Sequence, residues 1–97
     1  MLAAFSISPL GGTSDSVGDV VADCVGIVRQ SGLPNETNAM FTNVEGEWDE
    51  VMAVLKACAD RVLQEASRVS MVIKLDIRPG HQGMLTQKVQ RVEKALG

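Results

Sequence analysis

The side chains that could do chemistry gather between Asn38 and Met52, in the stretch NAMFTNVEGEWDEVM. It begins with small polar residues around Met40 and Phe41, and it reaches the only tryptophan of the chain, Trp48, among acidic residues. Hydroxyl and amide groups beside apolar side chains are typical of sites that hold a small polar ligand. The stretch is therefore either the wall of such a site or only a loop that leads into a helix.

Two carboxylates, Glu45 and Asp76, each lie close to the end of a predicted strand. A carboxylate in a partly closed site could hold a cationic ring or accept a hydrogen bond from an amino group. Solvation at the surface is the alternative for both. The sequence pairs no nucleophile with a base, and the single histidine, His81, is expected at the surface in the loop RPGHQG. We therefore expect a protein that is not an enzyme.

Metal and phosphate sites have little support. Cys24 and Cys58 fall on the apolar stripes of two predicted helices, which indicates buried free thiols in a reducing compartment. One histidine and no Cys-x-x-Cys pair argue against zinc. The turn LGGTSDS precedes a helix but lacks the Walker lysine and the GxGxxG spacing. We expect an ordinary turn in which Ser14 or Ser16 caps the helix, and no metal or cofactor.

Composition limits the class of protein. A chain of 97 residues with 45% hydrophobic residues suits a single domain, 1–97, and only three aromatic residues imply an aliphatic core. The net charge of -3 comes with scattered basic residues, so no nucleic-acid partner is expected. No apolar run approaches the ~20 residues that span a bilayer. The start MLAAFSISPLGG is a poor signal peptide, because no basic residue follows the methionine, and a cytoplasmic location is expected.

Hydrophobic periodicity places these residues on elements. Alternation predicts strands, stripes at helical spacing predict helices, and SGLPN, with Gly32 as a left-handed cap, ends the first helix. Trp48 is expected as a core anchor of the second helix, and the acids beside it are expected to serve the helix start. The predicted elements are a strand at 2–9, a helix at 16–30, short strands at 35–39 and 42–46 with a bend near Met40–Phe41, a helix at 47–65, a strand at 68–78 and a short C-terminal helix at 85–96.

This order, βαββαβ and then a helix, predicts an α+β ferredoxin-like sandwich. Right-handed crossovers put both main helices on one face of a four-stranded antiparallel sheet. Nothing in the chain is expected to cover the other face, which is either plainly solvated or used for assembly of subunits; open sheet edges could also pair with a second chain. The residues expected on this open face are Ala4, Ser6, Ser8, Val72, Lys74 and Asp76.

Several segments in the same order resemble the small thiamine-binding protein family related to YkoF. They are ISPLGG, NAMFTNVEGEWDEVM, RVSMVIKLDIR and KVQRVEKALG, and the most specific part runs from Met40 through Thr42 and Val44-Glu45-Gly46 to Trp48-Asp49. Members more often carry a Thr-Pro-Met-Gly-Thr run where this chain has Asn38-Ala39-Met40-Phe41-Thr42. In place of glycine, Phe41 would narrow a pocket or offer a ring for stacking.

The resemblance implies paired subunits, often a tetramer, and binding of thiamine or its hydroxymethylpyrimidine part without turnover. The ligand would lie near a subunit boundary, with negative charge from the two carboxylates, hydrogen bonds from Thr42, Ser6 and Asn38, and ring contacts from Met40 and Phe41. The alternatives are a structural or regulatory homo-oligomer whose sheet face serves assembly only, and an enzyme with an unrecognised acid pair. The predicted ligand-binding residues are Ser6, Asn38, Met40, Phe41, Thr42, Glu45, Lys74 and Asp76.

Overall fold

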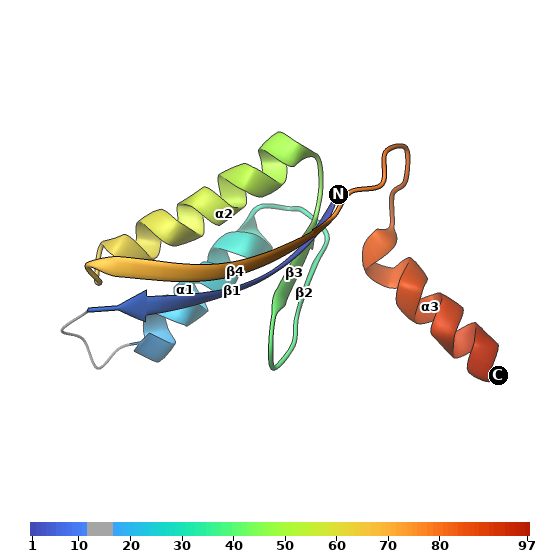
Figure 1. The fold of residues 1–97 in the computed structure, drawn as a ribbon, viewed down its shortest axis with the longest axis horizontal. Helices are drawn as coiled ribbons and strands as arrows, with labels where there is room; N and C mark the ends of the chain where they lie inside the picture. Colours follow the sequence, from blue (N-terminus) through green and yellow to red (C-terminus); the bar gives the residue numbers. More distant parts are fainter. Residues whose placement is uncertain (12–16) are drawn as a thin grey trace.

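One antiparallel sheet organises the computed structural model, which describes residues 1–11 and 17–97 (Figure 1). Its strands lie in the order β2-β3-β1-β4, so the ferredoxin-like prediction is confirmed. The expected caps Ser14 and Ser16 lie outside the described residues. In chain order the elements are β1 (Leu2–Leu10), α1 (Val17–Gln30), β2 (Asn35–Thr37), β3 (Thr42–Glu45), α2 (Trp48–Leu63), β4 (Arg68–Asp76) and α3 (Met84–Leu96).

Alternation along the strands explains which face carries the core. Ala3 and Phe5 of β1 are buried against α1 and α2, whereas Ser8 on the other face is exposed. The antiparallel register puts Val44 opposite Ala3 and Thr42 opposite Phe5, so β3 adds to the same core face. Both helices therefore cover one face, as the crossover rule predicts.

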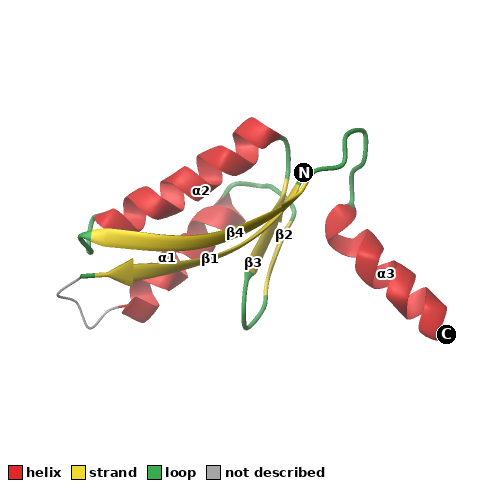
Figure 2. Ribbon diagram, viewed as in Figure 1, coloured by secondary structure: helices red, strands yellow, loops and turns green. Residues whose placement is uncertain are grey.

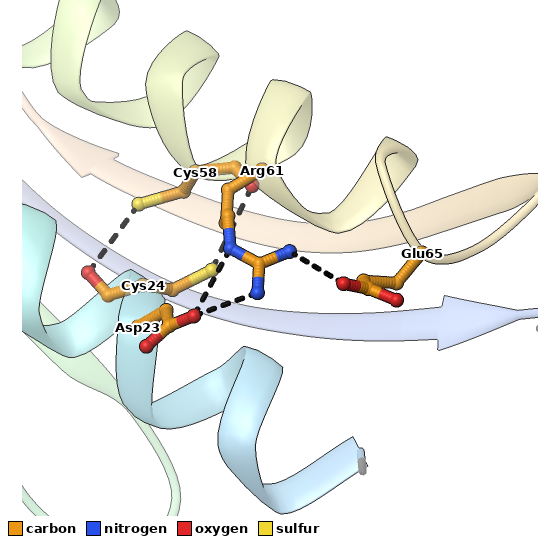
Figure 3. Close-up of polar contacts among 5 residues, drawn as sticks. All are labelled: Asp23, Cys24, Cys58, Arg61 and Glu65. Atoms are coloured by element: carbon orange, nitrogen blue, oxygen red, sulfur yellow. Dashed lines mark hydrogen bonds and ion pairs between the residues drawn. The ribbon is translucent and has the colours of Figure 1, made fainter. Parts of the chain in front are cut away.

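The two cysteines lie at the α1–α2 contact as buried free thiols, as expected (Figure 3). Each Sγ lies 3.6 Å from the main-chain oxygen of the other cysteine. Burial, with the neighbouring Cys24, raises the pKa of the Cys58 thiol to about 12, so both groups stay protonated and pack as small apolar residues. Beside them Arg61 of α2 pairs with Asp23 of α1 at 2.7 Å.

The start of α2 confirms one expectation and corrects another. Glu47 and Glu50 form a capping box, in which each carboxylate accepts from the backbone N–H of the other residue. The acids after Gly46 therefore do serve the helix start. The expectation that Trp48 anchors the core is wrong, because its side chain is 53% exposed. As the first helical residue it lies one turn before Val51, which is the first buried residue of the helix.

The strands differ in length, and this shapes the candidate site. All nine residues of β1 pair with β4, from Leu2↔Asp76 to Leu10↔Arg68. Only the first four, from Leu2 to Phe5, pair with β3. The β1–β4 ribbon therefore continues past the ends of β2 and β3, as Figure 2 shows.

Helix α3 begins on the sheet face opposite α1 and α2. Glu45 lies opposite Leu2 in the register, on the face away from the core, and its carboxylate accepts from the N–H groups of Met84 and Leu85 at 3.0 and 3.1 Å. Asp76 on the same face pairs with Lys88. The expectation that nothing in the chain covers this face is thus wrong at the end of the sheet that carries Glu45 and Asp76. The rest of α3 points away from the sheet (Figure 1).

Candidate functional site

A hollow of ≈ 180 Å³ lies between the β2–β3 bend, the edge of β1 and α1. It brings together five of the eight predicted ligand residues. It is smaller than the ~300–1,000 Å³ pockets that hold drug-sized ligands, so it suits one ring rather than two. The residues lining it are Phe5, Ser6, Ile7, Val21, Cys24, Val25, Thr37, Asn38, Ala39, Met40, Phe41 and Thr42.

Asn38 sets the shape of the bend. Its side-chain oxygen accepts from the N–H groups of Met40 and Phe41, both at 2.9 Å, and its own N–H donates to the Phe41 carbonyl oxygen at 2.9 Å. This is the local pattern by which asparagine stabilises turns. The side-chain oxygen of Asn38 is thus already engaged by two hydrogen bonds. In the described part of the chain no residue pairs with its side-chain NH₂ group, which can donate to a ligand. Met40 at the tip is 74% exposed.

Thr42 is the buried polar group of this hollow. It is 9% exposed and lies opposite Phe5, with its side chain on the helix-covered face. No hydrogen bond joins its hydroxyl to another residue in the described part of the chain. A hydroxyl that lines a hollow can both donate and accept, so Thr42 is suited to hold a polar edge of a ring.

Ser6 borders the hollow differently from the prediction. It lies opposite Val72 in the register and alternates with Phe5 and Ile7. Its hydroxyl therefore faces the open side of the sheet, and Ser6 reaches the hollow through its main chain.

The other three predicted residues lie elsewhere. Glu45 and Asp76 hold the start of α3, and Lys74 lies opposite Ala4 on the open face. The hydrogen bond from Lys88 lowers the pKa of Asp76, which keeps this carboxyl ionised and paired. The structure thus does not bring these charges together with the hairpin residues.

A second hollow, of ≈ 300 Å³, lies near Met1, Leu33 and the loop at 81–83, and it is acidic. Its three carboxylates, Glu45, Glu47 and Glu50, already accept hydrogen bonds from the N-terminal N–H groups of α3 and α2. A cation there would compete with these caps, so we prefer the hairpin hollow. In the described residues no group of three or more His, Cys, Asp or Glu side chains could hold a metal ion. The described helices include none with the length and apolar character to cross a bilayer.

Sequence reasoning missed Ile7 and the α1 residues Val21 and Val25, which also line the hollow. Their apolar side chains look like ordinary core positions, so helical and strand periodicity could not single them out. One usable signal was the difference in length between the first predicted strand and the short one at 42–46, because a long strand beside a short one leaves an edge open.

Comparison with known proteins finds one family over nearly the whole chain and solved structures of the same fold. The family model described as "Thiamine-binding protein" matches residues 3–93. A UPF0045 protein of Mycobacterium bovis is 50% identical over 97 residues, covering 99% of this chain and 94% of its own length. A solved structure of a hypothetical protein from Methanocaldococcus jannaschii superposes with a TM-score of 0.82 at 31% identity, covering 96% and 95% of the two chains. A domain of unknown function from Bacillus cereus gives 0.83 at 33% identity, covering 93% and 86%.

Proposed function

Because this chain belongs to the thiamine-binding protein family, we propose that it binds thiamine, or its hydroxymethylpyrimidine part, without chemical turnover. The observation that carries the proposal is the hollow at the hairpin bend. Residues 38–42, of which Met40 and Thr42 match the run that the resembled family carries, wrap around it and leave the Thr42 hydroxyl free of described partners. A turn that keeps the Met and Thr of the family's run and folds around a ring-sized space supports a binding role.

The two halves of thiamine differ in how well they suit this space. The aminopyrimidine ring is flat and carries adjacent hydrogen-bonding groups, which the Thr42 hydroxyl and the Asn38 amide can meet. Met40 and Phe41 supply apolar surface to the ring faces. At ≈ 180 Å³ the hollow takes the pyrimidine, and the cationic thiazolium extends toward solvent or a second subunit.

We also propose that the protein works as a cytoplasmic homodimer or homotetramer. Its accessible surface is 6442 Å², against about 5,400 Å² for a typical folded monomer of this mass. Its radius of gyration is 14.7 Å, against about 12.5 Å for a compact chain of this length. The excess of about 1,000 Å² is close to the ~800 Å² that one partner buries in a standard interface. Exposed apolar residues, including Val72 on the open sheet face and Val92 on α3, support burial against another copy.

The same excess surface favours the second candidate, a structural or regulatory oligomer in which the sheet serves assembly only. The two functions separate by calorimetry with three probes: thiamine, hydroxymethylpyrimidine and the isolated thiazole alcohol. Binding of the first two but not the third supports the ligand proposal. At 100-fold excess over Kd, thiamine then stabilises the protein by about 2.7 kcal/mol. If millimolar thiamine gives no heat and no thermal shift, the ligand proposal fails and only the assembly function remains.

A further inference from the structure

Beyond Phe5, strand β1 has a neighbour on one side only. Its pairing with β3 ends at Phe5↔Thr42, whereas its pairing with β4 continues to Leu10. Among the described residues no strand occupies the other side of residues 6–10. The hairpin hollow lies beside this free edge, because Ser6 and Ile7 line it.

Two hydrogen bonds establish the direction in which successive main-chain groups of β3 point. The N–H of Glu45 donates to the Pro34 oxygen and the Phe41 oxygen accepts from Asn38, so both residues turn their main chains toward β2. In an antiparallel ladder this direction alternates from one residue to the next, so the main-chain N–H and C=O of Thr42 point toward β1.

The same alternation continues along β1. Phe5 faces Thr42 across the ladder, so its main chain points toward β3, that of Ser6 toward β4, and that of Ile7 again to the β3 side. Beyond the end of β3 that side is the hollow. Pro9, at the next equivalent position, supports this geometry, because proline in a strand is confined to positions whose missing N–H faces no partner.

The N–H and C=O of Ile7 thus form an adjacent donor and acceptor on a partly buried wall. Main-chain groups in such places are nearly always paired with protein, water or ligand. A planar ring with a ring nitrogen next to an exocyclic amino group offers the complementary acceptor and donor. The thiazolium ring offers no such pair, since its nitrogen is quaternary and carries no proton.

We propose that the main chain of Ile7 is the recognition edge of this site, where its N–H donates to a pyrimidine ring nitrogen and its C=O accepts from the 4-amino group. The ring then sits where β3 would have continued. This inference rests on the proposed function and adds the ligand class: planar nitrogen heterocycles with an amino group beside a ring nitrogen. It also explains why the pyrimidine half, and not the thiazolium half, enters the hollow.

The first test is nuclear magnetic resonance of ¹⁵N-labelled protein titrated with hydroxymethylpyrimidine. The Ile7 amide should move downfield, while the Ser8 amide, which faces β4, serves as the internal control and should move little. A probe that lacks the 4-amino group should bind roughly two- to tenfold more weakly, since one hydrogen bond is lost. If hydroxymethylpyrimidine binds while Ile7 stays unmoved, or if the amino group makes no difference, the recognition edge is refuted and the proposed function stands. If neither probe binds, both fail.

A second test changes the main chain itself. Ile7→Pro removes the N–H but no bond of the β1–β4 ladder, and Ile7→Val keeps the N–H as the matched control. We expect Ile7→Pro to weaken hydroxymethylpyrimidine binding at least as much as removal of the amino group does, and clearly more than Ile7→Val does. Equal affinity of the two folded variants would overturn the inference. If Ile7→Pro does not fold, the titration decides.

Discussion

The carboxylate of Glu45 on β3 caps α3, accepting a hydrogen bond from the N–H of Met84 at 3.0 Å across 39 positions of sequence. Glu45 is only 6% exposed, and its second oxygen accepts from Leu85 at 3.1 Å. The charge therefore lies against the positive end of a helix, where it satisfies two otherwise free N–H groups. We conclude that this carboxylate stabilises the docking of α3.

Replacing Glu45 with alanine should loosen α3 without emptying the hairpin hollow. Loss of a buried, charged acceptor costs about 1–3 kcal/mol, and hydrogen exchange should rise first in the opening turns of α3. Thiamine affinity should stay within twofold. Glu36→Ala, an exposed glutamate on β2, is the control and should change neither. Loss of thiamine binding with α3 still protected would instead put Glu45 in the ligand site.

The pairing of Asp76 with Lys88 should respond to acid only at low pH. The pairing lowers the pKa of Asp76 below its usual 3.8, so its stabilising effect is complete above that value and is lost as pH falls through the lower, folded-state pKa. Exchange protection of α3 should therefore be constant from pH 7 to pH 5 and fall below 3.8. Asp76→Asn should remove this component of the acid response. A loss of protection already at pH 5 would contradict the assignment.

Thr42→Val should weaken ligand binding while keeping the fold. Valine has nearly the shape of threonine and suits a buried strand position, so only the hydroxyl is lost. Removal of one neutral hydrogen bond predicts a loss of about 0.5–1.5 kcal/mol, or roughly two- to tenfold in Kd, by calorimetry with hydroxymethylpyrimidine. Thr86→Val on α3 is the matched change outside the hollow and should leave Kd unaltered. Identical affinities for both variants would remove Thr42 from the site.

A charge on the open sheet face should disperse the assembly. Val72 on β4 is 60% exposed, so Val72→Asp costs little in an isolated chain but would bury an unpaired charge in an interface. Sedimentation should show a smaller species for this variant. Ala22→Asp, at an exposed position of α1, should keep the size of the wild-type protein. A wild-type monomer, or an assembly indifferent to Val72→Asp, would refute subunit packing through this face.

The fold was predictable because the residues that end its helices and set the faces of its strands act on their immediate neighbours in the sequence. Gly32, which takes the left-handed φ of 78°, and Pro34 end α1, and alternation fixes the faces of β1 and β4. The hairpin bend at Met40–Phe41 followed from the short segment between breakers. Trp48 was misplaced, because its spacing from Val51 and Leu55 fits the apolar stripe, and periodicity does not show that burial begins only at Val51.

The site was predictable only in part, for a physical reason. Asn38, Met40, Phe41 and Thr42 are neighbours in sequence, so a turn was enough to bring them together. The partner of Glu45 lies 39 residues away on α3, and no local pattern reports it. The main-chain role that we propose for Ile7 has no side-chain signature at all. It depends on where β3 stops.

The most direct measurement is a crystal structure of the protein grown with saturating thiamine. We expect electron density for a pyrimidine ring in the hollow enclosed by β1, α1 and residues 37–42, within hydrogen-bonding distance of Thr42 and the Ile7 main chain. Density in the acidic hollow beside Glu47 and Glu50 instead, or an empty hairpin hollow at saturating thiamine, would contradict it.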